Sequence, residues 1–463
     1  MIRMRRLFVL FGVGAGVTFG VPAAAMAHGI GGRGDLPVPF LAFVIGAGVA
    51  IVASFVALTL RWHEPRLQTL DTKVVRSGSG RWRGLAKVVG LVALTATVVD
   101  GFFAPNASLS IAPVLVWIYF WLVVPFASAV LGDSWRWLNP FRTIAELVNR
   151  DVPEQPEIAR RLGVWPAATL FVAFTWLELV SRDVSEPRTL AVAAITYTLI
   201  IIAATRVFGV ESGLRSFEAF STYNSLFGRI SILDLEPEPA AVGTATTAPT
   251  TAIVGRRGLL RALPQTPLHA GLTAFVVAMI GTVSYDGLAG SEIWADWFSG
   301  ELRREAWFET VALIGTVLAI GTAYLVAAKG AAVLAGSERK GWDVAQSFAH
   351  TLVPIALAYA VAHYFTLVLF EGQLLFIVFS DPFGLGWNLL GTTDWSINFF
   401  LEPIVIWYIQ VGVIVAGHIA AVVLAHDRAI AEFGAQRAAR TQYATLVLMV
   451  LLTSLGLFLL SGG

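Results

Sequence analysis

Four residues of the sequence have types and positions that would suit a metal ion at one end of a membrane protein: His28, Asp100, Asp286 and His363. Asp100 and Asp286 each end an apolar segment and are followed by glycine. The C-terminal end of a helix is negative, so an acid there is disfavoured unless a cation, either arginine or a metal ion, lies beside it. The alternative is that each Asp-Gly pair only forms the turn that ends the helix.

The two histidines would complete this site. His28 follows an A-x-A cleavage signal at 25–27 and would become the first residue of the mature chain. Its amine and imidazole together suit copper or zinc. His363 lies in the outer half of a later apolar segment, one helical turn after Tyr359. We therefore expect one divalent metal, zinc or copper, at the outer face. The alternatives are an ordinary N-terminal residue and a packed, hydrogen-bonded histidine.

Three other histidines lie toward the inner ends of the later segments. His350, His418 and His426 would bracket a haem if their helices faced one another. The sequence has no cysteine and no H-E-x-x-H, G-x-S-x-G or P-loop motif. Disulfides and thiolate metal sites are therefore excluded, and no nucleophile of a known motif is present.

The composition predicts that helices in a membrane position these residues. Of 463 residues 56% are hydrophobic and 14% charged, whereas a soluble domain has about a quarter charged. Ten apolar segments come close to the ~20 residues that cross a bilayer. They are 37–60, 84–103, 111–131, 163–181, 189–208, 268–287, 306–328, 346–370, 402–425 and 442–461. Because a helix satisfies its own backbone in lipid, we expect an all-α polytopic bundle of about ten transmembrane helices.

The charges predict how this bundle is oriented. Three arginines before an apolar run, and the A-x-A signal, indicate a signal peptide at 1–27; the alternative is an uncleaved first helix. With the mature N-terminus outside, five loops are cytoplasmic: 61–83, 132–162, 209–267, 329–345 and 426–441. They hold most of the 32 Lys and Arg, as the positive-inside rule requires. We expect a multi-pass cell-membrane protein with both mature ends outside. A net charge of +1 gives no reason to expect nucleic acid as a partner.

The loops divide the chain into parts. Residues 28–235 form a first transmembrane half, 236–255 a flexible cytoplasmic linker, and 256–463 a second transmembrane half. Amphipathic stretches at 135–148 and 214–230 are predicted to lie along the membrane surface with their apolar faces toward lipid. The outer segment 371–401 has no Lys or Arg and is rich in Phe, Leu and Trp. It should lie on the membrane, enter the bundle or cover a partner.

Several short motifs resemble those of a known group of proteins. They comprise His28, Gly29 and 34–39; Gly132, Asp133, Trp135 and Leu138 to Arg142; Ala349, His350, Pro354, Tyr359 and His363; and Gly417, His418 and His426. Together they resemble bacterial membrane proteins labelled fenitrothion hydrolase, and the likeness spans most of the chain outside the linker. The resemblance implies a membrane-bound hydrolase of organophosphate esters that works with a second subunit.

Three functions are therefore open at this point. For a hydrolase, a metal at the outer face would polarise the phosphoryl oxygen of a neutral phosphotriester and activate a water molecule. A permease would have helices broken by glycine or proline that meet near the membrane midplane. A component of a membrane redox complex would bind a metal or a haem.

Overall fold

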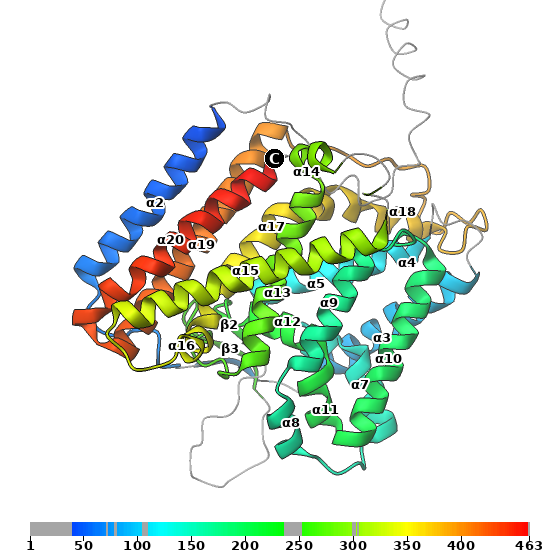
Figure 1. Cartoon of the computed structure of the whole chain (residues 1–463). Helices are drawn as coiled ribbons and strands as arrows, with labels where there is room; N and C mark the ends of the chain where they lie inside the picture. Colours follow the sequence, from blue (N-terminus) through cyan, green and yellow to red (C-terminus); the bar gives the residue numbers. More distant parts are fainter. Residues whose placement is uncertain are drawn as a thin grey trace, which may run out of the picture.

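The computed structural model describes residues 39–70, 73–77, 81–103, 110–235, 252–298, 302 and 305–461, and these form a bundle of long helices (Figure 1). Within those ranges nine helices are long and apolar enough to cross a membrane, and a bent pair makes a tenth. The all-α polytopic bundle predicted from the sequence is confirmed. The spans are α2 (Phe40–Arg61), α3 (Arg81–Phe103), Ile111–Leu131, the bent pair α8 (Pro156–Leu162) and α9 (Trp165–Leu179), α10 (Pro187–Phe208), α13 (Ala270–Ala289), α15 (Ala306–Leu334), Gly341–Ser380, α19 (Pro403–Phe433) and α20 (Ala435–Leu460).

Two of these spans are built from several pieces. Ile111–Leu131 consists of α4 (Ile111–Pro113), the π-helix η3 (Val114–Val123) and α5 (Val124–Leu131). Gly341–Ser380 consists of α16 (Gly341–Phe348), the 3₁₀ turn η5 (Ala349–Leu352), α17 (Val353–Phe370), the 3₁₀ turn η6 (Glu371–Gln373) and α18 (Leu374–Ser380). Changes of helix type inside a span interrupt the regular backbone ladder, and they often mark functional positions.

Helix α13 is the centre of the bundle. It packs against α9, α15 and α17. Of the residues in its apolar stretch 72% are buried, compared with 17% for α2 at the edge of the bundle. In Figure 1, α13 lies between α17 and α9. Residues that α13 contributes are therefore shielded from lipid, so a polar side chain on it needs partners from neighbouring helices.

The predicted cytoplasmic loops gather at one end of the bundle. Gln265 donates to the carbonyl of Gln68 at 2.7 Å, and Arg142 pairs with Glu211 at 2.5 Å. Arg339 pairs with Glu432. We call this end the basic face; it comprises 61–70, 132–162, 209–235, 252–269, 335–340 and 426–441. Because these segments alternate with the spans, their meeting at one end supports the predicted order of crossings. Which side of the membrane this end faces stays a prediction.

A small sheet at the basic face joins distant parts of the chain. Strand β3 (Ala252–Arg256) pairs antiparallel with both β1 (Lys73–Ser77) and β2 (Leu233–Leu235). The end of the predicted linker, 252–255, is therefore strand; the rest of it, 236–251, lies outside the described residues, as does the predicted signal peptide. The pairing of β3 with β1 is set by contacts between residues far apart in sequence, which the local composition could not indicate.

The amphipathic stretches pack into the protein as well as lining its surface. They form α6 (Trp135–Leu138), α7 (Pro140–Asn149), α11 (Val210–Phe217) and α12 (Ala219–Gly228). Trp135, Leu214 and Phe227 are buried in the main core, whereas Leu147 is 73% exposed. The prediction that their apolar faces turn toward lipid was therefore wrong for the buried half of these side chains, namely Trp135, Phe141, Leu214, Phe220 and Phe227. They form a second layer beneath the spans, which hydrophobic periodicity alone cannot distinguish from a membrane-surface helix.

Asp133 gives the basic face a pH dependence that can be measured. Burial raises its pKa to about 6, because the charged form is poorly solvated. A carboxyl with a raised folded-state pKa stabilises the fold below its ordinary pKa, and this contribution is lost as the pH rises through about 6. Asp133→Asn mimics the protonated form and keeps an oxygen for the Arg136 amide.

The thermal midpoint of the wild type should therefore fall relative to that of Asp133→Asn as the pH is raised from about 4 to 7. Differential scanning fluorimetry in detergent would measure both midpoints. Since every other group titrates alike in the two proteins, a difference that stays constant with pH would contradict the prediction.

Candidate functional site

Asp286 and His363 lie in direct contact inside the bundle. Asp286 is on α13, and its Oδ2 lies 2.8 Å from Nε2 of His363 on α17. The Tyr364 hydroxyl donates to the same Oδ2 at 2.8 Å. The side chains of Asp286 and His363 are 14% and 9% exposed. Two of the four residues singled out in the sequence are thus brought together, although 77 residues separate them.

A second carboxyl group, that of Glu178 on α9, belongs to the same cluster. Its Oε1 accepts from Nε1 of Trp121 at 2.8 Å. Its carboxyl also lies within reach of the Tyr364 hydroxyl and of the Asp286 charge. Tyr223 stacks on Trp121 with ring centres 5.1 Å apart. We call Glu178, Asp286, His363 and Tyr364 the carboxylate centre; three separate spans, α9, α13 and α17, supply it.

One oxygen of the centre is unusual. Oε2 of Glu178 is buried and has no hydrogen-bond partner among the described residues. An unpaired charged oxygen in an apolar interior costs several kcal/mol. A proton on Oε2 would remove the charge and allow the group to donate to the Tyr364 oxygen. The geometry is therefore that of a group which binds a proton.

Two other buried acids show the contrast. Glu218 is 0% exposed and its two oxygens accept five hydrogen bonds. The donors are Trp135 Nε1, Asn139 Nδ2, the Ser221 and Phe220 amides and the Tyr197 hydroxyl, at 2.7–3.1 Å. Asp427 accepts from Trp62, the Arg66 and Leu67 amides and Gln68. Carboxylates satisfied in this way stabilise the fold as anions, so Glu218 and Asp427 are structural.

The spans that supply the centre and its surroundings are irregular. Trp121 lies on the π-helix η3. Glu178 lies on α9, which is bent by 55° from α8. His363 and Tyr364 lie on α17, which follows the 3₁₀ turn η5 and has Pro354 in its first turn. Three of the four spans that meet here thus depart from a regular α-helix, and only α13 is regular.

Asp100 lies in a different environment. Its Oδ2 accepts from the Ser110 hydroxyl and, at 2.9 Å, from the Ala112 amide. It therefore caps the N-terminal end of the following span, whose positive dipole offsets the acid. Its other oxygen, Oδ1, is buried and has no hydrogen-bond partner among the described residues, so the predicted role of Asp100 as a metal ligand stays a prediction. His28 lies outside the described residues.

In the part of the chain that the structure describes, no group of three or more His, Asp and Glu side chains is placed to hold a metal ion. The predicted four-residue metal site, which includes His28, stays a prediction. His426 is not open to haem iron, since its ring nitrogens contact the Trp62 carbonyl and Gln442, each at 3.0 Å. His350 and His418 are also buried, 2% and 0% exposed.

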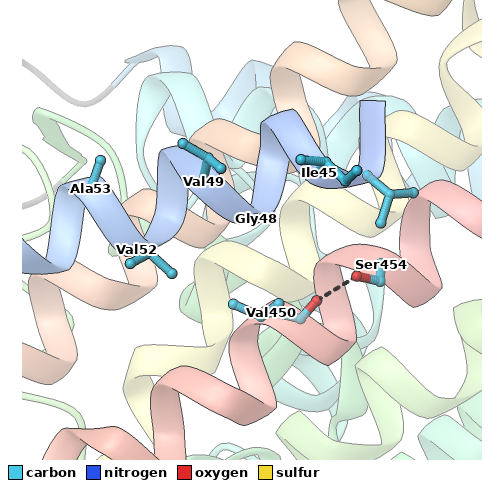
Figure 2. Close-up of a pocket in the computed structure, with 8 residues that line it drawn as sticks. Ile45, Gly48, Val49, Val52, Ala53, Val450 and Ser454 are labelled. Atoms are coloured by element: carbon cyan, nitrogen blue, oxygen red, sulfur yellow. Dashed lines mark hydrogen bonds between the residues drawn. The ribbon is translucent and has the colours of Figure 1, made fainter. Parts of the chain in front are cut away.

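A groove of about 510 Å³ lies away from the centre, between α2 and α20 (Figure 2). Seven of its eight lining residues are apolar, among them Val49, Val52 and Val450. The hydroxyl of Ser454 donates to the Val450 carbonyl, as the dashed line shows. The groove therefore offers hydrocarbon contact to lipid and no group for chemistry.

Comparison with protein-family models, with curated proteins and with solved structures finds no match for this chain. The resemblance to fenitrothion hydrolases therefore stays a prediction, and the function is argued from the carboxylate centre.

Proposed function

We propose that this integral membrane protein is a proton-coupled permease, whose carboxylate centre takes up and releases a proton as a solute crosses the bilayer. The observation that carries the proposal is the buried carboxyl of Glu178: its Oε2 has no hydrogen-bond partner among the described residues, and the group lies within reach of the Tyr364 hydroxyl. Ionisable groups are rare at membrane depth because burying their charge is costly, and they commonly serve proton relays.

The chemistry of Tyr364 explains why a proton is expected here. Its hydroxyl has one hydrogen, which it donates to Asp286. The same oxygen can then accept from Glu178 only when that carboxyl is protonated. Protonation of Glu178 thus extends a chain of hydrogen bonds through Tyr364 to Asp286 and His363. Deprotonation breaks the first link, leaving two like charges close together in an apolar setting, a state that favours rearrangement.

The irregular spans support a carrier. Carriers bind substrate and coupling ion where discontinuous helices meet inside the membrane. Here the π-helix η3 carries Trp121, which contacts Glu178, and the α8–α9 bend and the η5–α17 junction interrupt the spans of Glu178 and His363 nearer the basic face. Such interruptions leave backbone groups able to change partners, which allows neighbouring helices to move past one another.

The proposal predicts pH-dependent access to the interior near the centre. The chain has no cysteine, so Thr366→Cys introduces a single reporter; Thr366 is buried, on α17 close to Tyr364. In proteoliposomes, the rate of maleimide labelling should change between about pH 5 and 8. This change should be several-fold larger or smaller than the change that the ionisation of the thiol alone would cause. The same reporter with Asp286→Asn should show the titration of the thiol alone.

Infrared pH-difference spectra give a second, independent measurement. The wild type should show a carboxylic C=O band at the high frequency of an acid in apolar surroundings, and Glu178→Gln should lose it. Glu157→Gln is the matched control, because Glu157 is 71% exposed and pairs only with Arg160. The proposal would be abandoned if Glu178→Gln kept the band and Asp286→Asn left cysteine access unchanged.

The contact between Asp286 and His363 also supports a second candidate, the hydrolase that the sequence resemblance implies. A carboxylate that orients an imidazole is the usual arrangement of a general base. In that case purified protein should hydrolyse a neutral phosphotriester, His363→Ala should lower the rate by about 10²–10⁴-fold, and metal analysis should find a bound divalent ion. Hydrolysis without pH-dependent cysteine access would favour this candidate over the permease.

A further inference from the structure

His418, on α19, has its hydrogen positions fixed by the backbone. Its Nδ1 lies 2.9 Å from the Ile414 carbonyl, which can only accept, so Nδ1 carries the hydrogen. Nε2 of neutral His418 then has a free lone pair. This nitrogen is buried and has no partner within the described residues, and the side chain is 0% exposed. A buried lone pair of this kind accepts a hydrogen bond from water or takes up a proton.

His350, on the turn η5, is a second such group nearer the basic face. It is 2% exposed, and neither ring nitrogen makes a hydrogen bond within the described residues. The Arg428 guanidinium and the Ser347 backbone are the polar groups beside it. Arg428 also contacts the Ser347 hydroxyl and Gln68, at 3.1 and 3.3 Å, and pairs with Glu432. His350 is therefore next to a charged, partly exposed cluster that opens to the basic face.

The two histidines lie at different heights along the span that contains α17. Gly417 lies against Pro354 and Ala358, since a Cβ on Gly417 would lie 2.7 Å from the Pro354 carbonyl oxygen and 2.4 Å from the Ala358 Cβ. His418, the next residue, lies beside Tyr359 and is therefore about nine residues, or ~13 Å, along the axis from His350. A chain of several water molecules would bridge that distance.

The same line continues to the carboxylate centre. The ring of Tyr359 lies 5.9 Å from that of His418, between centroids. His363 follows Tyr359 by one helical turn, about 6 Å. From Arg428 to Asp286, polar side chains thus succeed one another along α17.

We propose that His350 and His418, joined by internal water, form a proton route from the basic face to the carboxylate centre. This inference rests on the proposed function and adds to it a second access, because the centre itself lies toward the opposite end of the bundle. A carrier needs its proton site to exchange with both sides, and this route would supply the side that the centre does not face.

Nitrogen-15 NMR of histidine-labelled protein, with magnetisation transferred from water, tests the route in the wild type. His350 and His418 should receive magnetisation from water. His426 is the matched control on α19, because both its ring nitrogens already contact protein groups. Assignment uses single histidine replacements. Histidines 350 and 418 that receive no more magnetisation than His426 would overturn the route, whatever the state of the centre.

The sidedness of the pH response tests what the route does. The Thr366→Cys reporter is placed in proteoliposomes whose two sides are buffered separately. With the wild-type route, a pH change on either side should alter labelling. With His418→Leu, the response to the basic-face side should be lost and the response to the opposite side kept. If both responses persist, the route is wrong and the centre stands; if the wild type responds to neither side, the proposed function itself fails.

Discussion

Replacing Glu218 with alanine is expected to lower the free energy of unfolding by about 3–5 kcal/mol. The carboxylate is 0% exposed and joins α6, α7, α10 and the start of α12 through its five donors. Removing it leaves Trp135 Nε1, the Tyr197 hydroxyl and two amides without an acceptor, while Asn139 keeps only its bond to the Ser221 hydroxyl. Each buried unpaired group costs about 1–3 kcal/mol before relaxation.

Thermal or mixed-micelle unfolding of purified protein would measure this loss. Glu218→Gln keeps one acceptor oxygen but places an NH₂ group, which is a donor, opposite other donors. Its loss of unfolding free energy should therefore be intermediate. Glu157→Ala serves as the surface control, since an exposed ion pair contributes at most about 1 kcal/mol. A Glu218→Ala protein as stable as Glu157→Ala would show that the five hydrogen bonds do not hold the basic-face layer together.

The structural role of Glu218 and the functional role proposed for Glu178 could not be separated in the sequence. Both are glutamates beside apolar residues. What distinguishes them is the number of donors that the fold brings to each carboxyl group, and those donors come from helices far apart in the chain. Glu178 was also easy to overlook because it comes three residues before the end of the predicted span 163–181, although an acid inside a span is itself a signal.

The fold was predictable because its main cause is local: a run of about 20 apolar residues becomes a helix in lipid whatever its neighbours are. The sequence predicted only that Asp286 and His363 both lie at the outer face of the membrane. Their actual contact depends on the packing of α13 against α17, which hydropathy does not encode. The contacts of Asp100 are local, because its partners Ser110 and Ala112 lie within twelve residues. The sequence near Asp100 therefore contained the groups that it binds at the start of the next helix.

Helix α17 both packs closely in the bundle and carries residues of the carboxylate centre. This helix must pack closely enough to bury His363 and Tyr364, yet it begins at the 3₁₀ turn that carries His350. Close packing against α19 is achieved by a missing side chain at Gly417. The spacing between α17 and α19 thus sets both the stability of the bundle and the approach of His418 to Tyr359.

Gly417→Ala tests that spacing with a single methyl group. The added Cβ would lie 2.4 Å from the Ala358 Cβ and 2.7 Å from the Pro354 carbonyl oxygen, too close for either to remain in place. Overpacking of this kind costs about 1–3 kcal/mol, in spite of alanine's better helix propensity. Gly412→Ala is the matched control on α19, because its Cβ would meet nothing within 4 Å.

Unfolding of the two variants should therefore differ in sign relative to the wild type, with Gly412→Ala unchanged or more stable and Gly417→Ala less stable. Because separation of the helices also moves His418 from Tyr359, Gly417→Ala should weaken the labelling response to pH on the basic-face side while Gly412→Ala keeps it. Equal stability of the two variants would mean that α17 and α19 do not pack at Gly417, and the proton route would lose the contact on which its middle section depends.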